Sequence, residues 1–148
     1  MTDAAEAVAD TLVVERDLPF PPERVWRALT ENALVADWLM PGDFTPEPGR
    51  AFTFRAAPTP HWDGIVDGEV LAVEPPLRLA YRWNTGADPS KGLRTIVTFT
   101  LTRTGGGTRL RMEQAGFRPG EEIYLKGARF GWERMLGALE RVTGAIGD

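Results

Sequence analysis

The sequence predicts an α+β fold in which an antiparallel sheet of about six strands packs against one long C-terminal helix. Between Glu121 and Ile146 apolar residues recur at alternating intervals of three and four, which places them in one stripe along a helix. The stripe consists of Leu125, Ala128, Trp132, Met135, Leu139, Val142 and Ile146. Earlier in the chain apolar residues recur at every second position, as they do in strands. No second stretch indicates a helix of comparable length, so we expect the sheet to cover the stripe.

The first part of the chain is expected to form one strand and two short helices. Residues 1–10 are small and acidic and are expected to be a disordered tail, followed by a single domain over residues 11–148. Residues 11–18 alternate as in a strand, and Pro22 suits the first turn of a helix that carries Val25, Trp26 and Leu29. Asn32 is expected to cap a second short helix, which carries Leu34, Trp38 and Leu39.

The middle of the chain is expected to form a meander of about five strands. Alternating apolar residues mark strands near residues 52–54, 63–73, 77–83 and 93–102. Pro75-Pro76 ends the second of these, because proline cannot donate to a sheet ladder. Gly105–Gly107 predicts a tight reversal into a last strand that carries Leu110 and Met112.

Composition excludes several classes of protein and of site. The 148 residues contain no cysteine and a single histidine, which excludes disulfides, thiolate metal sites and multi-histidine metal sites. A net charge of -4 without a run of lysine or arginine argues against nucleic-acid binding. No apolar run approaches the ~20 residues that span a bilayer, and no signal peptide is indicated. We therefore expect a cytoplasmic protein with no nucleic-acid partner, no membrane insertion, no metal and no cofactor.

Several short motifs follow one another in an order typical of a known superfamily. The chain resembles the helical opening of the START-like superfamily, also called SRPBCC, at PERVWRALT (residues 22–30) and at Trp38-Leu39. It resembles the branch named after the activator of the heat-shock-protein-90 ATPase at Gly68-Glu69-Val70, Pro75-Pro76 and LAYRW (residues 79–83). GGGTRL (residues 105–110) and Gly131-Trp132, followed by Leu136 and Leu139, complete the resemblance. Gln114 departs from it, since this branch often carries a histidine there.

The resemblance implies a helix-grip fold, in which a curved antiparallel sheet wraps around the C-terminal helix and leaves a cavity between them. It also implies that a small hydrophobic ligand binds in this cavity. The expected ligand-binding residues are inward-facing or lie on the helix: Trp38, Phe52, Phe54, Tyr81, Trp83, Phe99, Met112, Tyr124, Ala128 and Trp132. The alternative is that these large side chains fill a core and leave no cavity.

Catalytic chemistry has little support in the sequence, and we assign no catalytic residue. His61 lies in a loop or at a strand edge and is a candidate polar contact for the ligand; Tyr81 and Tyr124 are the other polar candidates. The glycine-rich stretch at 105–107 precedes a strand rather than a helix, so it does not predict a phosphate-binding loop. No G-x-S-x-G or H-E-x-x-H motif occurs.

Two glycines within the predicted long helix allow two interpretations. Gly127 and Gly131 lie four residues apart, and each costs about 1 kcal/mol of helix propensity relative to alanine. In the first interpretation, their missing side chains leave room for a ligand. In the second, they allow close packing of the helix on a strand.

Three function classes remain open at this stage. The first is a carrier or sensor of a small hydrophobic or amphipathic molecule, which we favour. The second is an enzyme of cyclase or hydrolase type, which would need a polar cluster in the cavity. The third is a chaperone-regulating protein-interaction module, suggested by the branch name alone, although fold does not fix function.

A homodimer is a further prediction. Ile123 and Phe130 lie seven residues apart and nearly opposite the centre of the apolar stripe. Such a pair is covered either by a second copy of the chain or by a loop of the same chain. The loops at 44–48 and 87–91 are the candidates for that intramolecular cover.

Overall fold

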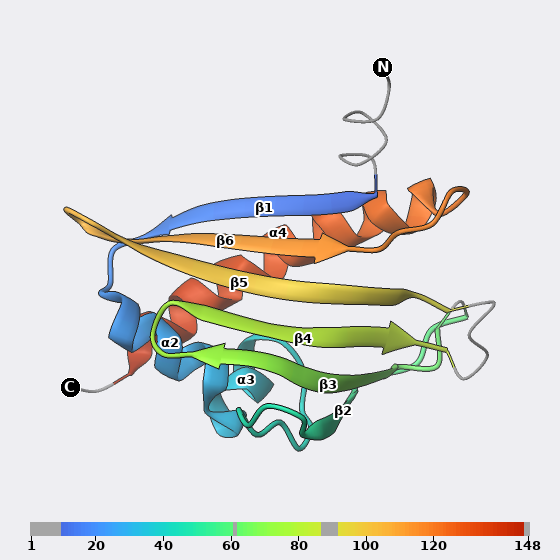
Figure 1. Ribbon diagram of the computed structural model, residues 1–148, viewed down its shortest axis with the longest axis horizontal. Helices are drawn as coiled ribbons and strands as arrows, with labels where there is room; N and C mark the ends of the chain where they lie inside the picture. Colours follow the sequence, from blue (N-terminus) through green and yellow to red (C-terminus); the bar gives the residue numbers. More distant parts are fainter. Residues whose placement is uncertain (1–9, 61, 87–91, 147–148) are drawn as a thin grey trace.

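A six-stranded antiparallel sheet forms the body of the protein (Figure 1). The computed structural model describes residues 10–60, 62–86 and 92–146. The strands are β1 (Thr11–Leu18), β2 (Ala51–Arg55), β3 (Ile65–Glu74), β4 (Arg78–Thr85), β5 (Arg94–Thr104) and β6 (Gly107–Ala115). Their order across the sheet is β1-β6-β5-β4-β3-β2, so the strands from β2 to β6 form the predicted meander and β1 joins its far edge. Residues 1–9 of the predicted tail lie outside the described residues.

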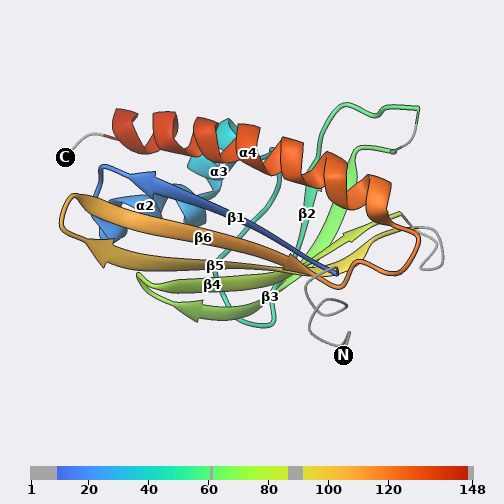
Figure 2. The same ribbon diagram turned by 90° about the horizontal axis from the view of Figure 1, so that it is seen from above.

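Three helices cover one face of this sheet (Figure 2). They are α2 (Pro22–Thr30), α3 (Asn32–Trp38) and α4 (Glu122–Ala145). With 24 residues at about 1.5 Å each, α4 extends across the whole sheet. The helix contacts β1, α2 and α3. These observations confirm the α+β helix-grip fold. None of the described helices is long and apolar enough to cross a membrane.

The apolar stripe of α4 is split between two environments. Trp132 and Leu139 of the stripe, together with Leu136 beside it, are buried against the sheet and the other helices, with exposed fractions of 2% or less. Ala128 and Met135 belong to the same predicted stripe but are only partly buried. The helix is therefore rotated so that one flank of its apolar face remains open.

Asn32 holds a loop rather than capping α3. The N-cap position is Glu31, and it makes no side-chain capping hydrogen bond, so the predicted role of Asn32 is wrong. The Asn32 side-chain amide donates to the carbonyl oxygen of Gly42 at 2.9 Å and accepts from the backbone N–H of Phe44 at 2.9 Å. This pairing directs the loop between α3 and β2 into the interior.

Phe44 fills space over the β2–β4 end of the sheet. Its ring is 3% exposed and lies 5.3 Å from the ring of Phe52 and 5.6 Å from that of Tyr81, both in edge contact. Such aromatic pairs contribute about 0.5–1.5 kcal/mol beyond the area they bury. The β2–β4 end of the sheet is therefore packed by side chains of its own loop.

Candidate functional site

An apolar pocket of about 1020 Å³ lies along the open flank of α4. We call it the α4 pocket. Residues of α4 form one wall, and the opposite wall comes from the end of α3, from β3 and β4, and from the connection that follows β2, which rises from the sheet to the level of α4 in Figure 2. Its apolar lining includes Leu39, Met40, Ala56, Trp62, Val66, Leu93, Met135 and Ala138. This size and character are usual for sites that bind small molecules.

Five of the predicted ligand-binding residues line this pocket: Trp38, Trp83, Tyr124, Ala128 and Trp132. The rings of Trp83 and Trp132 lie 5.3 Å apart and bridge the gap between β4 and α4. With Trp62, four of the five tryptophans of the chain line the pocket. Tryptophan emission should therefore report on whatever occupies it.

The other five predicted residues lie in the packed core and not on the pocket wall: Phe52, Phe54, Tyr81, Phe99 and Met112. Each is at most 2% exposed. For Phe52, Phe54 and Tyr81 the physical reason is the loop after α3, because the ring of Phe44 lies against all three. The ring of Phe99 is covered instead by those of Trp38 and Trp132. The burial of these five residues fits the interpretation of large inward residues as core filling.

Gly127 and Gly131 leave the pocket wall of α4 bare. A Cβ atom placed on either glycine would meet no atom within 4 Å beyond its chain neighbours and the adjacent backbone of α4, and both residues line the pocket. By contrast, a Cβ on Gly68 of β3 would lie 2.2 Å from the ring of Phe52, so that glycine does serve close packing. The interpretation of Gly127 and Gly131 as close-packing contacts is therefore wrong. Their missing side chains leave space in the pocket.

Gln114 is the buried polar group of the pocket. Its side chain is 1% exposed, accepts from the indole N–H of Trp132 at 2.9 Å and donates to the hydroxyl of Thr95 at 3.0 Å. That hydroxyl donates in turn to the carbonyl oxygen of Trp83 at 2.8 Å. The chain of bonds fixes the two tryptophan-bearing elements relative to each other. Gln114 lies two residues after Met112 on β6, so both side chains point to the inner face of the sheet. This spacing is the signal in the sequence that indicates an inward position for Gln114.

The polar candidates from the sequence contribute less. His61 lies outside the described residues. Tyr81 lies in the core, and its burial raises the pKa of the phenol far above its usual range. The phenol therefore stays neutral. Tyr124 lines the pocket with 53% of its surface exposed. In the part of the chain that the structure describes, no group of three or more histidine, aspartate or glutamate side chains could hold a metal ion.

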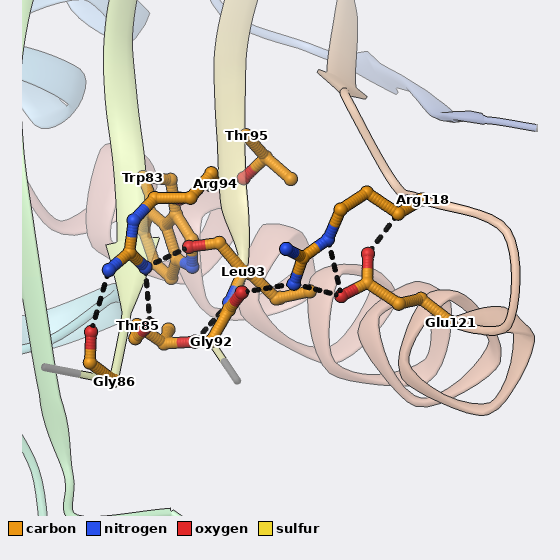
Figure 3. Close-up of polar contacts among 9 residues, drawn as sticks. All are labelled: Trp83, Thr85, Gly86, Gly92, Leu93, Arg94, Thr95, Arg118 and Glu121. Atoms are coloured by element: carbon orange, nitrogen blue, oxygen red, sulfur yellow. Dashed lines mark hydrogen bonds and ion pairs between the residues drawn. The ribbon is translucent and has the colours of Figure 1, made fainter. Parts of the chain in front are cut away.

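An arginine–glutamate pair at the start of α4 binds the backbone directly before the pocket-lining residue Leu93 (Figure 3). The Arg118 guanidinium donates to the carboxylate of Glu121 at 2.8 Å and to the carbonyl oxygen of Gly92 at 2.6 Å. Burial is the largest influence on the pKa of Glu121 and raises it, but the hydrogen bonds and charge of Arg118 together outweigh burial and hold that pKa below its usual range. The pair ties the start of α4 to the segment before β5.

A second arginine organises the strand ends beside this pair. The Arg94 guanidinium donates to the carbonyl oxygens of Thr85 and Leu93, both at 2.7 Å, and to that of Gly86 at 3.0 Å (Figure 3). Thr85 and Leu93 line the α4 pocket. These bonds therefore hold the pocket wall at the ends of β4 and β5.

Two apolar side chains of α4 that were predicted to lie opposite its apolar stripe are exposed, but Ile123 also lines the α4 pocket, so only Phe130 lies away from the pocket. Ile123 is 84% exposed and Phe130 is 68% exposed. The cover predicted from the loop at 44–48 is wrong, because Phe44 is buried in the core instead. The loop at 87–91 lies outside the described residues.

The sequence of the chain matches a known protein family over most of its length. Residues 19–144 match the family described as "Activator of Hsp90 ATPase homolog 1-like protein". The chain belongs to this family. The family is part of the START-like (SRPBCC) superfamily, whose fold commonly binds hydrophobic ligands, and the predicted resemblance is confirmed.

Solved structures of other proteins share this family's fold. Protein MLL2253 from Mesorhizobium loti is 47% identical, with a TM-score of 0.84, and the match covers 93% of this chain and 99% of that one. DynU16, a protein of the dynemicin biosynthetic locus, is 28% identical with a TM-score of 0.75, over 92% of this chain and 48% of its own. CalU16 from Micromonospora echinospora is 24% identical with a TM-score of 0.71, over 91% and 76%, and shows the fold alone. A search of curated proteins found none that matches.

Proposed function

We propose that this protein binds a small hydrophobic or amphipathic molecule in the α4 pocket and acts in the cytoplasm as its carrier or sensor. The observation that carries the proposal is the bare wall of α4. Gly127 and Gly131 face open space within a pocket of about 1020 Å³, although each lowers the helix propensity of α4. A helix that only packed on its sheet would gain about 1 kcal/mol from alanine at each position.

The composition of the walls supports the same proposal. Indole rings and aliphatic side chains supply most of the lining, and Gln114 offers a neutral amide at the inner wall. Sites for small molecules typically combine an apolar surface with a few polar groups that orient the ligand. The family likewise commonly binds hydrophobic ligands.

Titration with the neutral dye Nile red tests this proposal. We expect one dye per chain, an increase in dye emission, and quenching of tryptophan emission, because Trp83 and Trp132 lie on the pocket wall. Absence of dye binding at tens of micromolar protein, or binding that leaves tryptophan emission unchanged, would count against an apolar site at this place.

Two other function classes stay predictions. An enzyme of cyclase or hydrolase type would use Gln114 or Tyr124 as polar contacts to its substrate, since both line the pocket. A chaperone-regulating role rests on the family description alone. The apolar pocket favours the binding function over both.

The predicted homodimer would bury the exposed apolar residues of α4. A second copy seated on Ile123 and Phe130 would remove both side chains from water. Sedimentation equilibrium of the wild type at tens of micromolar should then show a dimer, and Phe130→Glu should return the protein to a monomer. A wild type that is monomeric under these conditions rules the dimer out.

A further inference from the structure

We infer that the ligand of the α4 pocket is an amphipathic anion, whose charged group binds at the rim to Arg134 and Arg141. The inference rests on the proposed binding function and specifies its ligand class. Its basis is the distribution of charge around the pocket.

The charged residues of the pocket lining all have one sign. Arg134 and Arg141 line the pocket, and among the described residues that line it there is no aspartate or glutamate. This excess is local, because the chain as a whole has a net charge of -4. An apolar site with a purely cationic rim is complementary to a molecule with an apolar body and an acidic group.

Most arginines elsewhere in the described residues form ion pairs with carboxylates, although Arg55 and Arg129 do not. Arg16 binds Glu140 at 2.8 Å, and Arg27 binds Glu31 at 2.7 Å. Within the described residues, no ion pair is found for Arg134 or Arg141, and Glu140, the sequence neighbour of Arg141, is already bound to Arg16. Both rim arginines therefore retain guanidinium N–H groups for an external anion, which they match in a bidentate geometry.

The position of the arginines separates charge from apolar surface. They lie seven residues apart on α4, about 10 Å along the helix, and both are exposed to solvent. Arg134 lies over the exposed ring of Phe130, with its guanidinium carbon 5.9 Å from the ring centre. The inner wall holds Trp83, Trp132 and the neutral amide of Gln114. A charged group would lose its hydration there without a counter-charge, so the acidic end of a ligand belongs at the rim.

Two dyes of different charge test this inference. The anionic dye anilinonaphthalene sulfonate and the neutral dye Nile red are titrated into wild type, into the double variant Arg134→Gln with Arg141→Gln, and into the control Arg129→Gln. Arg129 lies on the same helix away from the pocket and reaches only the carbonyl oxygen of Val13, at 3.3 Å. In the double variant we expect the Kd of the anionic dye to rise about tenfold, the effect of roughly 1.4 kcal/mol, and the Kd of Nile red to stay unchanged.

The control variant and the salt dependence show whether a change in affinity comes from the charges of Arg134 and Arg141. Arg129→Gln should leave both affinities unchanged, and added salt should weaken only the anionic dye, because screening acts on exposed charges. An unchanged Kd of the anionic dye in the double variant overturns the inference, as does an equal loss for both dyes. Failure of both dyes to bind wild type would instead refute the proposed binding function itself.

Discussion

Replacing Gly131 with leucine is expected to abolish Nile red binding without destabilising the protein. The leucine side chain would project into the α4 pocket, where a Cβ meets no atom within 4 Å, so it occupies the space of the ligand without overpacking the core. Leucine also has a helix propensity about 0.8 kcal/mol better than glycine, which favours α4. Dye titration and thermal unfolding of the same sample measure both effects.

Gly137→Leu is the matched control for this change. Gly137 lies on the same helix but does not line the pocket, and the nearest atoms to its added Cβ would be the ends of the Arg16 and Arg141 side chains, at 3.8 Å and 3.9 Å. It should gain the same helix propensity and keep dye binding. A Gly131→Leu protein that binds dye as the wild type does, or that unfolds at a much lower temperature, would contradict the open wall of the pocket.

Phe44→Ala is expected to cause the largest loss of stability. Removing this buried ring leaves a cavity against Phe52 and Tyr81, and truncations of this kind cost about 3–5 kcal/mol. Urea unfolding followed by tryptophan emission measures the change in the free energy of unfolding.

Phe130→Ala is the control for the loss in the free energy of unfolding that is expected for Phe44→Ala. It removes the same ring from a position that is 68% exposed, so its effect should stay within about 0.5 kcal/mol. A loss below about 1 kcal/mol for Phe44→Ala would mean that the loop after α3 does not pack the interior, against the cost usual for a buried ring.

The fold could be predicted because its signals are local. The two-residue period of residues 11–18 coincides with β1, and the stripe lies within α4 except for Ile146, which follows its last residue. Both patterns depend only on the geometry of one element, 3.6 residues per turn or alternating sides of a strand. The order of such elements predicted a sheet packed on one long helix, and the resemblance to the START-like superfamily implied the helix-grip fold.

The candidate site could be predicted only in part, because it depends on contacts between distant segments. The hydrogen bonds from Asn32 direct Phe44 into the interior, and no periodic pattern reveals a loop that folds inward. For the same reason the sequence could not separate Trp83, which lines the pocket, from Tyr81, two residues earlier on the same face and buried in the core.

The glycines and Gln114 illustrate two different limits. The sequence shows that Gly127 and Gly131 lower the helix propensity of α4. Only the position of the opposite wall decides whether their missing side chains leave a pocket or permit close packing. Gln114 was visible by its inward parity on β6, and its bond to Trp132 required the packing of α4 against the sheet.

The most direct test of the central claim is the NMR spectrum of the tryptophan indole N–H groups during titration with Nile red. The chain has five tryptophans, of which Trp26 lies in α2 away from the α4 pocket and serves as an internal control. We predict that the indole signals of Trp38, Trp62, Trp83 and Trp132 shift on binding and that the signal of Trp26 stays in place. A dye that binds while the four pocket signals remain unchanged would contradict the assignment of the α4 pocket as the ligand-binding site.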